Sequence, residues 1–452
     1  MPAEAGKSSG KTRRNGKIFL RGRISPKFSV RMKLLVFAHT PPPHHGQSYM
    51  VKLMLEGFGG DVRQRPPGAP ANLYGIECYH VNARFSRGLA DVGTFRSAKF
   101  FLVFWFCLQA FWCRFRHGVK NLYYVPAPGK PVALYRDWLV MLLCRPFFQH
   151  VILHWHAAGL AKWLETETTI AARTATYRLF RPVDLSIVLS AYNVADAAKL
   201  RSARVAQVCN CAPDLCPDFA RTVAPRRRAR QAVRAGLLAG RAVPVGGGGL
   251  AGDRPDLVRA LFLAHCSREK GLFDAMEGVV LANQELARRG VALKFKLAVA
   301  GGFVDAAEKT EFEARLQTEA YAAAVEYLGF ISGPDKLKIL RETDVLCFPS
   351  YYLGENQPVS VIEAMSFGLP VVITNWRSLP EMFPPGYPGL VPPRSPQAIA
   401  GALLQLITSD SGERLREHYL AHFTVESYLA GLARAIHSLE TDPLPAGVPE
   451  PA

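Results

Sequence analysis

The 452-residue chain has few acidic residues, and most of its excess positive charge lies in two segments. It holds 37 Asp and Glu against 55 Lys and Arg, a formal net charge of +18. Residues 1–31 carry +8 and residues 221–256 carry +6, which leaves +4 for all other residues. The remaining body is therefore nearly neutral, and this argues against a protein that binds nucleic acid through a basic folded surface.

The sequence also lacks any apolar run long enough to cross a membrane. The longest run, Phe100–Cys113, is interrupted by Gln109 and falls short of the roughly 20 residues that a spanning helix needs. The basic N-terminal segment contains no apolar stretch typical of a secretory signal. We therefore expect a cytoplasmic protein, with the inner face of the cell membrane as an alternative location.

Disulfide and metal patterns are absent as well. The nine cysteines are odd in number and several lie in apolar runs, as buried thiols do. Cys209, Cys211 and Cys216 form a cluster, but neither a second pair nor a His partner follows at zinc spacing. His154 and His156 share a strand face without a third ligand nearby. The sequence predicts a reducing compartment and no metal site.

Short apolar runs alternate with longer amphipathic stretches, a pattern that predicts parallel sheets covered by helices. We expect an α/β protein with two doubly wound, Rossmann-like domains that face a central cleft. The predicted segments are a disordered basic leader (1–31), a first domain (32–220), a flexible Arg/Gly-rich linker or insertion (221–256), a second domain (257–410), helices that return to the first domain (411–440) and a disordered tail (441–452). Met32 directly precedes the first apolar strand and is an alternative start of translation.

The densest chemical signal is the string FPSYYLGENQPVSVIEAMSFGLPVV, which begins at Phe348. A buried strand ends at Phe348, and a helix is predicted to start near Val359, just after Pro358. The free N–H groups of its first turn favour an anion such as a diphosphate. Glu363, about one turn into the helix, has two oxygens that suit a vicinal diol such as a ribose. Glu355, in the loop, is placed to stabilise positive charge on a sugar ring.

This string closely resembles the E-x7-E signature of the retaining glycosyltransferases of family 4, which have the GT-B fold. That family has a Gly-Glu-x-x-Pro loop and then a helix that ends Glu-Ala-Met-x-x-Gly-x-Pro-Val-Val. The resemblance implies transfer of a sugar from a UDP- or GDP-sugar to a glycan or lipid-linked acceptor, as in cell-surface polysaccharide synthesis. It implies that the domain 32–220 binds the acceptor and that the domain 257–410 binds the nucleotide sugar. It also implies a metal-independent enzyme without a cofactor. The implied donor-binding residues of the string are Asn356, Gln357, Pro358, Val359 and Glu363, with Glu355 catalytic.

Further matches follow in the order of the family. The segment FLAHCSREKG places Lys270 where the family pairs a catalytic Lys with donor phosphates, and Lys is a suitable point charge for a phosphate. His265 stands where the family often has an Arg, and Arg268 is a candidate substitute. Ile331, in the segment LGFI, lies where the family holds the nucleotide base against the backbone.

The N-terminal half resembles the family less closely. Gly46 lies in a loop between the first strand and a helix, where the family has a glycine beside the donor phosphate. His156 is followed by Ala-Ala where the family has His-Gly-Gly, with its imidazole near the donor sugar. The resemblance therefore implies catalytic roles for His156, Lys270 and Glu355. The Asn of the turn that begins at Asn210 is also retained.

The aromatic segment 99–116 is flanked by basic residues and allows two interpretations. It is either a buried helix of the first domain, which we favour, or a helix that lies in a membrane interface. Other functional hypotheses are a GT-B-fold sugar-nucleotide epimerase or phosphorylase and a basic nucleic-acid-binding protein. The preferred partners are a nucleotide-sugar donor and a glycan or lipid-linked acceptor, with peripheral membrane contact and without nucleic acid.

Overall fold

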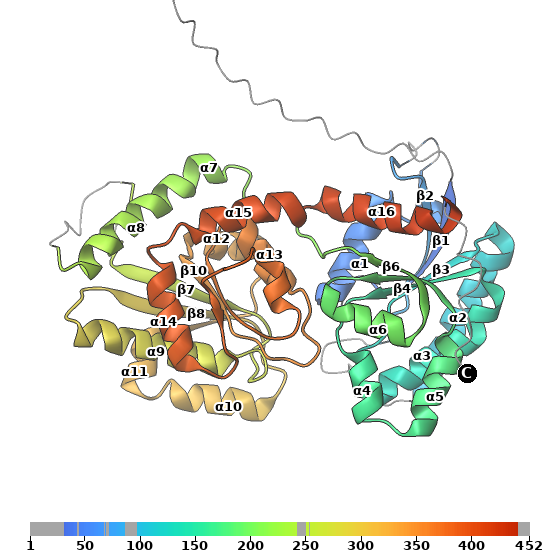
Figure 1. The fold of residues 1–452 in the computed structure, drawn as a ribbon, viewed down its shortest axis with the longest axis horizontal. Helices are drawn as coiled ribbons and strands as arrows, with labels where there is room; N and C mark the ends of the chain where they lie inside the picture. Colours follow the sequence, from blue (N-terminus) through green and yellow to red (C-terminus); the bar gives the residue numbers. More distant parts are fainter. Residues whose placement is uncertain are drawn as a thin grey trace, which may run out of the picture.

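The computed structural model describes residues 31–42, 45–66, 68, 72–85, 97–241, 250–252 and 254–441. The predicted disordered leader, except Arg31, and the predicted tail beyond Thr441 lie outside the described residues. The two α/β domains lie side by side, the first at the right of Figure 1 and the second at the left.

The N-terminal domain is a six-stranded parallel sheet in the order β2-β1-β3-β4-β5-β6. Its strands are β1 (Met32–Phe37), β2 (Ile76–Val81), β3 (Asn121–Tyr124), β4 (His150–Trp155), β5 (Val183–Val188) and β6 (Ser202–Gln207). Its helices are α1 (Gly46–Gly57), η1 (Val62–Gln64), α2 (Ser97–His117), α3 (Pro131–Cys144), η3 (Arg145–Phe147), α4 (Leu160–Thr166), α5 (Ile170–Phe180), η4 (Ala191–Asn193) and α6 (Val194–Lys199).

The C-terminal domain contains a second six-stranded parallel sheet, in the order β12-β11-β10-β7-β8-β9. Its strands are β7 (Leu257–Leu263), β8 (Lys294–Ala300), β9 (Val325–Gly329), β10 (Val345–Phe348), β11 (Val371–Thr374) and β12 (Leu390–Val391). Its helices are α7 (Phe219–Thr222), α8 (Ala224–Leu238), α9 (Leu272–Arg288), α10 (Ala306–Arg315), α11 (Glu319–Ala324), α12 (Gly333–Glu342), α13 (Val359–Ser366), η5 (Leu379–Met382), α14 (Pro396–Leu406) and α15 (Ser411–His422).

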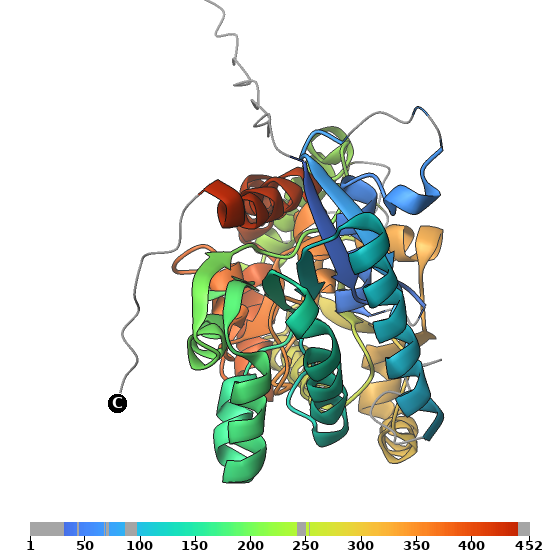
Figure 2. The same ribbon diagram turned by 90° about the vertical axis from the view of Figure 1, so that its right-hand side faces the viewer.

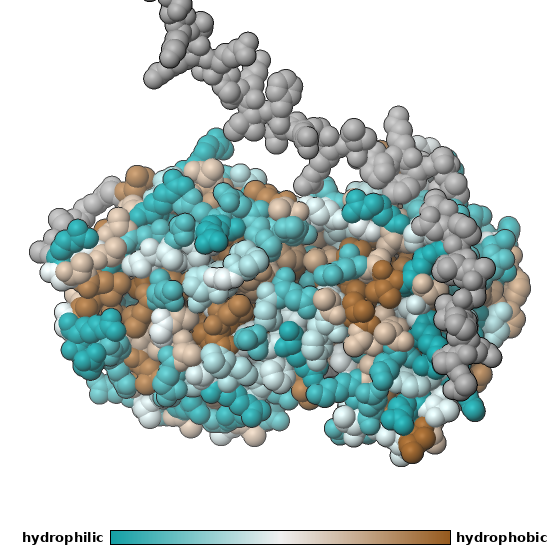
Figure 3. Space-filling view, in the orientation of Figure 1, coloured by the Kyte–Doolittle hydropathy of each residue, from teal (hydrophilic) through white to brown (hydrophobic). Residues whose placement is uncertain are grey.

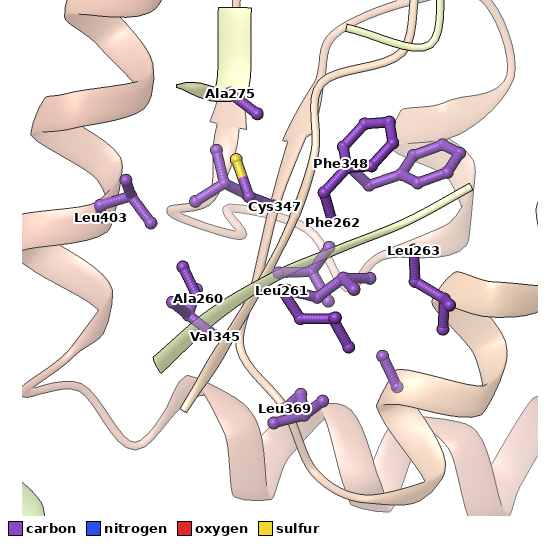
Figure 4. Packing of buried hydrophobic residues seen from close by; sticks show 14 of the residues in the cluster. Ala260, Leu261, Phe262, Leu263, Ala275, Val345, Cys347, Phe348, Leu369 and Leu403 are labelled. Carbon is purple, nitrogen blue, oxygen red and sulfur yellow. The ribbon is translucent and has the colours of Figure 1, made fainter. Parts of the chain in front are cut away.

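The central strands are buried on both faces because helices pack on both faces of each sheet. All residues of β3, β10 and β11 are buried, as the continuous apolar runs of these strands predict for a parallel sheet. Figure 4 shows the side chains of β7 and β10 packed together, with Leu403 of α14 beside them. The predicted fold class, two facing Rossmann-like domains, is confirmed.

Two C-terminal helices run along the top of both domains in Figure 1. α15 packs against α13 in the second domain, and Arg416 of α15 pairs with Asp214 at 2.7 Å. α16 (Val425–Thr441) packs on the first domain, where Tyr428 and Leu432 join the core beneath β1 and β5. The chain therefore crosses between the domains twice.

The prediction of a flexible linker over 221–256 is wrong for its first part. α7 and α8 cover the second domain, and the boundary between the cores lies between Cys211 and Ala212. Arg230 and Arg234 of α8 are buried and bind Asp344, with N–O distances of 3.0 and 2.8 Å. These two arginines neutralise a buried carboxylate. At these positions the arginine-rich composition therefore belongs to an internal ion network and not to a solvated linker. Residues 242–249, the glycine-rich part, lie outside the described residues.

The sequence pattern also missed several elements. β6 has few apolar residues because it is an edge strand whose side chains are only partly buried or exposed. The amphipathic stretch 307–324, which the sequence pattern predicts as one helix, forms two helices, α10 and α11, separated at residues 316–318. The remaining predicted strands match observed strands with shifts at their ends.

Candidate active site

The two Glu residues of the string flank the start of α13, at the carboxyl edge of the second sheet. β10 ends at Phe348, and α13 begins directly after Pro358, which takes an extended conformation (φ −65°, ψ 123°). No side chain caps the first turn of α13, and no acidic residue lies in that turn. The first turn therefore retains the anion-binding capacity of a helix N-terminus.

Glu355 is buried and bound by two donors. Lys270 Nζ lies 2.6 Å from its carboxylate, and Ser350 Oγ donates to the same oxygen at 2.7 Å. The Lys270 ammonium also lies 4.9 Å from the centre of the Tyr352 ring. The structure thus brings together two of the predicted catalytic residues in one ion pair.

A glycine allows this pair to form. Gly271 has φ +79°, and a Cβ at this position would lie 2.2 Å from the Pro349 carbonyl oxygen. Only glycine tolerates both the left-handed conformation and this approach. The backbones also bond directly, since Tyr351 N donates to Glu269 O at 2.8 Å. The Lys-Gly loop therefore lies against the Glu355 loop.

Glu363 is buried in a second ion pair, with Lys336 Nζ of α12 at 2.6 Å. Burial raises the pKa of Tyr49 to about 12, with the Glu363 carboxylate contributing, so Tyr49 of the first domain lies close to this pair. The sequence pattern assigned no role to Lys336. A lysine on the helix after the LGFI segment was the available signal.

The predicted glycine loop of the first domain meets the same helix terminus. A Cβ built on Gly46 would lie 3.7 Å from the Val359 side chain, so the two predicted donor-binding positions are neighbours across the domains. In the same loop, His45 caps α1, and its Nε2 lies 2.8 Å from His39 Nε2. Burial lowers the pKa of His39 to about 4, with His45 contributing next.

His156 lies just after β4, with buried ring nitrogens that have no hydrogen-bond partner among the described residues. Burial lowers its pKa to about 3; the nearby His45 contributes and the Asn210 side chain opposes. The Asn210 side-chain oxygen is likewise buried without a partner in the described part of the chain. Unpaired buried polar groups are costly, so these two side chains are candidates to receive a ligand.

The two candidate substitutes in the phosphate clamp have different positions. Burial lowers the pKa of His265, with Lys270 contributing and Glu355 opposing, so His265 lies beside the Lys270–Glu355 ion pair. Arg268 instead pairs with Glu311 and lies over the Phe273 ring at 4.7 Å. The structure therefore brings His265 to the site and directs Arg268 away from it.

Asn356 and Gln357 occupy the contact between the domains. Gln357 accepts from Asn210 N and donates to Leu189 O, both at 2.8 Å. Asn356 donates to Asn193 and accepts from Ser190 Oγ. The sequence predicted that both side chains bind the donor. Both are instead buried against the first domain, and their observed contacts are with protein groups.

Two other positions complete the comparison with the predicted site. Ile331 is partly buried against the C-terminal core, at the end of the loop after β9. Glu381, which sequence reasoning missed, accepts from Ala191 N at 2.7 Å and from Tyr192 N at 3.0 Å across the domains. Nothing in the local sequence marks Glu381, because its partners are backbone groups from the other domain. Among the described residues, no three His, Cys, Asp or Glu side chains form a group that fits a metal ion.

Facing α/β domains with a charged site between them define the GT-B fold, and solved structures share it. A sucrose-phosphate synthase from Thermosynechococcus elongatus aligns with 90% of this chain and 99% of its own, with a TM-score of 0.61 and 18% identity. HepE of Anabaena, solved with UDP and glucose, aligns with 90% of this chain and 100% of its own, with a TM-score of 0.58 and 14% identity.

Residues 254–419, which hold Lys270, Glu355 and Glu363, match the family described as glycosyl transferases group 1. The O-antigen chain mannosyltransferase B of Escherichia coli is 38% identical over 88 residues, 19% of this chain and 22% of its own length. The phosphatidyl-myo-inositol mannosyltransferase of Mycobacterium leprae is 32% identical over 112 residues, 25% of this chain and 29% of its own length. The chain thus spans less than a third of the length of either relative.

Proposed function

We propose that this protein is a retaining glycosyltransferase that moves a sugar from a UDP- or GDP-sugar to a glycan or lipid-linked acceptor, in the synthesis of a cell-surface polysaccharide. The observation that carries the proposal is the pair of buried glutamates on either side of the α13 N-terminus, each bound to a lysine at 2.6 Å. The printed names of two relatives, both mannosyltransferases, support the reaction class.

The ion pairs suggest how a donor would bind. The first turn of α13 and the Lys270 ammonium would hold the diphosphate, and Lys270 would then share its charge between the phosphate and Glu355. Glu363 would accept hydrogen bonds from the ribose hydroxyls, with Lys336 Nζ 2.6 Å from the same carboxylate. Glu355, held by Ser350 at 2.7 Å, would stabilise positive charge on the sugar ring.

The first domain would complete the site. His156 has unpaired ring nitrogens and remains neutral at pH 7 because burial lowers its pKa to about 3. A neutral imidazole can donate a hydrogen bond to the transferred sugar from one ring nitrogen, or accept one at the other, without adding charge. The Gly46 loop would close over the diphosphate from the other side. No step in this scheme assigns a role to a metal ion, and we propose a metal-independent reaction.

The reaction is proposed to take place in the cytoplasm, beside the inner face of the cell membrane. All nine cysteines are free thiols, which suits a reducing compartment. Two of the arginines of α8, Arg230 and Arg234, point inward to Asp344, and this favours a sugar donor over a nucleic acid as the partner.

A donor screen and two variants test the proposal. Thermal shifts with UDP-, GDP- and ADP-sugars should single out one base, and transfer of a labelled sugar should follow with retention at the anomeric carbon. Glu355→Ala and Lys270→Ala should abolish transfer and the slow hydrolysis of the donor. Unchanged rates in both variants would overturn the proposal, and release of an epimer or a sugar phosphate would assign a different reaction.

A further inference from the structure

The α2 helix presents an apolar face to solvent along its whole length. Phe101, Trp105, Leu108, Trp112 and Phe115 are 75%, 57%, 57%, 52% and 67% exposed. Their spacing of three or four residues places them on one side of the helix. We call these five residues the α2 face. Surface helices of soluble proteins normally present polar residues outward, so a continuous apolar face of this kind marks an interaction site.

The opposite side of α2 serves the core. Val103, Phe106, Cys107, Ala110 and Cys113 are buried against the first sheet and α3. The expectation of a buried helix is therefore correct for one side of the helix only. α2 is apolar all around, and the fold buries one half of it.

The α2 face continues onto the neighbouring elements. The Phe147 ring of η3 packs edge-on against Phe115, with centroids 5.9 Å apart, and is itself 44% exposed. Tyr135 and Leu142 of α3 are also exposed. Figure 2 looks onto the side of the first domain that is turned away from the second, and α2 runs along this side. The space-filling view in Figure 3, from a direction at right angles to Figure 2, shows a notch between the lower parts of the two domains.

The charge around this surface is almost entirely positive. Residues 97–149 hold seven Lys and Arg and one acid, Asp137. Asp137 is buried and paired with Arg136 at 2.7 Å, so these two charges cancel and the other six basic residues carry the excess. Arg116 and Lys120 are exposed, and the Arg63 guanidinium lies 5.9 Å from the centre of the Trp112 ring.

We propose that the α2 face lies on an anionic lipid bilayer. From Phe101 to Phe115 the face extends about 21 Å at 1.5 Å per residue, and no described helix is long and apolar enough to cross a membrane. Trp and Phe are suited to the interface between headgroups and acyl chains, and basic side chains beside them bind anionic headgroups. A second copy of the chain is the less favoured occupant, because two surfaces rich in Arg and Lys would repel each other.

This inference deepens the proposed function, because it would hold the cleft near lipid-linked acceptors, but its test needs neither donor nor acceptor. Binding of the full-length chain is measured by flotation with vesicles of phosphatidylcholine, alone or mixed with phosphatidylglycerol. We expect binding to the mixed vesicles and weak binding to phosphatidylcholine alone. The variant Phe101→Ser/Trp105→Ser/Leu108→Ser should bind about a hundredfold more weakly, since each side chain loses part of its apolar burial.

Matched controls separate this surface from general effects. Ile170→Ser/Val304→Ser removes exposed apolar side chains elsewhere and should bind like the wild type. Arg116→Glu/Lys120→Glu should weaken binding to mixed vesicles by more than tenfold, because each lost charge costs about fivefold.

The folding of each variant is verified by its thermal transition and its far-UV circular dichroism spectrum. If the triple variant binds mixed vesicles as strongly as the wild type, the inference is overturned. Equal binding of the wild type to vesicles with and without phosphatidylglycerol would also overturn it. So would a dimer in lipid-free solution that the triple substitution dissociates. A wild-type chain that binds the mixed vesicles but transfers no sugar would overturn the proposed function alone.

Discussion

Glu355→Gln isolates the charge of the proposed catalytic carboxylate while keeping its shape. In the wild type this carboxylate accepts from Lys270 Nζ at 2.6 Å and from Ser350 Oγ at 2.7 Å. The glutamine oxygen can still accept one of these hydrogen bonds, so the loop should remain in place. The variant removes the negative charge that would face a developing oxocarbenium ion.

The expected effects on stability and rate differ in size. Breaking a fully buried ion pair costs about 3–5 kcal/mol, and an exposed pair contributes about 0–1 kcal/mol. The Lys270 side chain is 18% exposed and keeps one acceptor, so we expect a loss of about 1–2 kcal/mol in unfolding free energy. Loss of a preorganised electrostatic contact at the reacting centre typically lowers kcat about 10²- to 10³-fold.

Denaturant unfolding gives the stability change, and initial rates at saturating donor give kcat. Glu311→Gln is the control, because Glu311 is paired with Arg268 and Arg315 on α10, away from the Glu355 pair. This control should keep wild-type kcat. A Glu355→Gln enzyme with wild-type kcat, or with a rate loss fully explained by unfolded protein, would refute the reasoning.

Other expected outcomes concern the fold and its response to pH. Asp344→Ala leaves two buried arginines unpaired and should cost about 3–5 kcal/mol in chemical denaturation, whereas Glu413→Ala breaks an exposed pair and should cost under about 1 kcal/mol. Gln357→Ala leaves backbone groups of the first domain unpaired and should cost about 2–4 kcal/mol; a loss below about 0.5 kcal/mol would show that the domain contact does not need this side chain. Burial lowers the pKa of His39 to about 4 and of His156 to about 3 from 6.5. The unfolded chain therefore takes up protons first, and unfolding free energy should fall below pH 6.5 by about 1.4 kcal/mol per pH unit for each histidine that stays neutral; a constant value between pH 6.5 and 5 would contradict this.

The sequence was most informative where local chemistry decides the structure. The mainly apolar runs of β3, β10 and β11 predicted buried parallel strands, and Pro358 predicted the start of α13. The spacing of Glu355 and Glu363 follows from their place on one loop and one helix. These features depend on residues near each other in the chain, so a sequence pattern records them.

The sequence was least informative where a side chain has a distant partner. The arginines of 221–256 had the composition of a linker, because Asp344, which pairs with two of them, lies about a hundred residues away. Asn356 and Gln357 fit a donor-binding loop, yet their partners are in the first domain. Lys336 became visible as a partner of Glu363 only when α12 was placed beside α13.

The sequence alone thus determined the fold class, most strands of the two sheets and the glutamate string that marks the candidate site. Only the tertiary structure decided which cations bind those glutamates, that His265 and not Arg268 lies beside them, and which half of α2 faces solvent. The physical reason is that periodicity and turn residues encode local conformation. Ion pairing and burial depend instead on which surfaces meet, and those surfaces come from segments far apart in the chain.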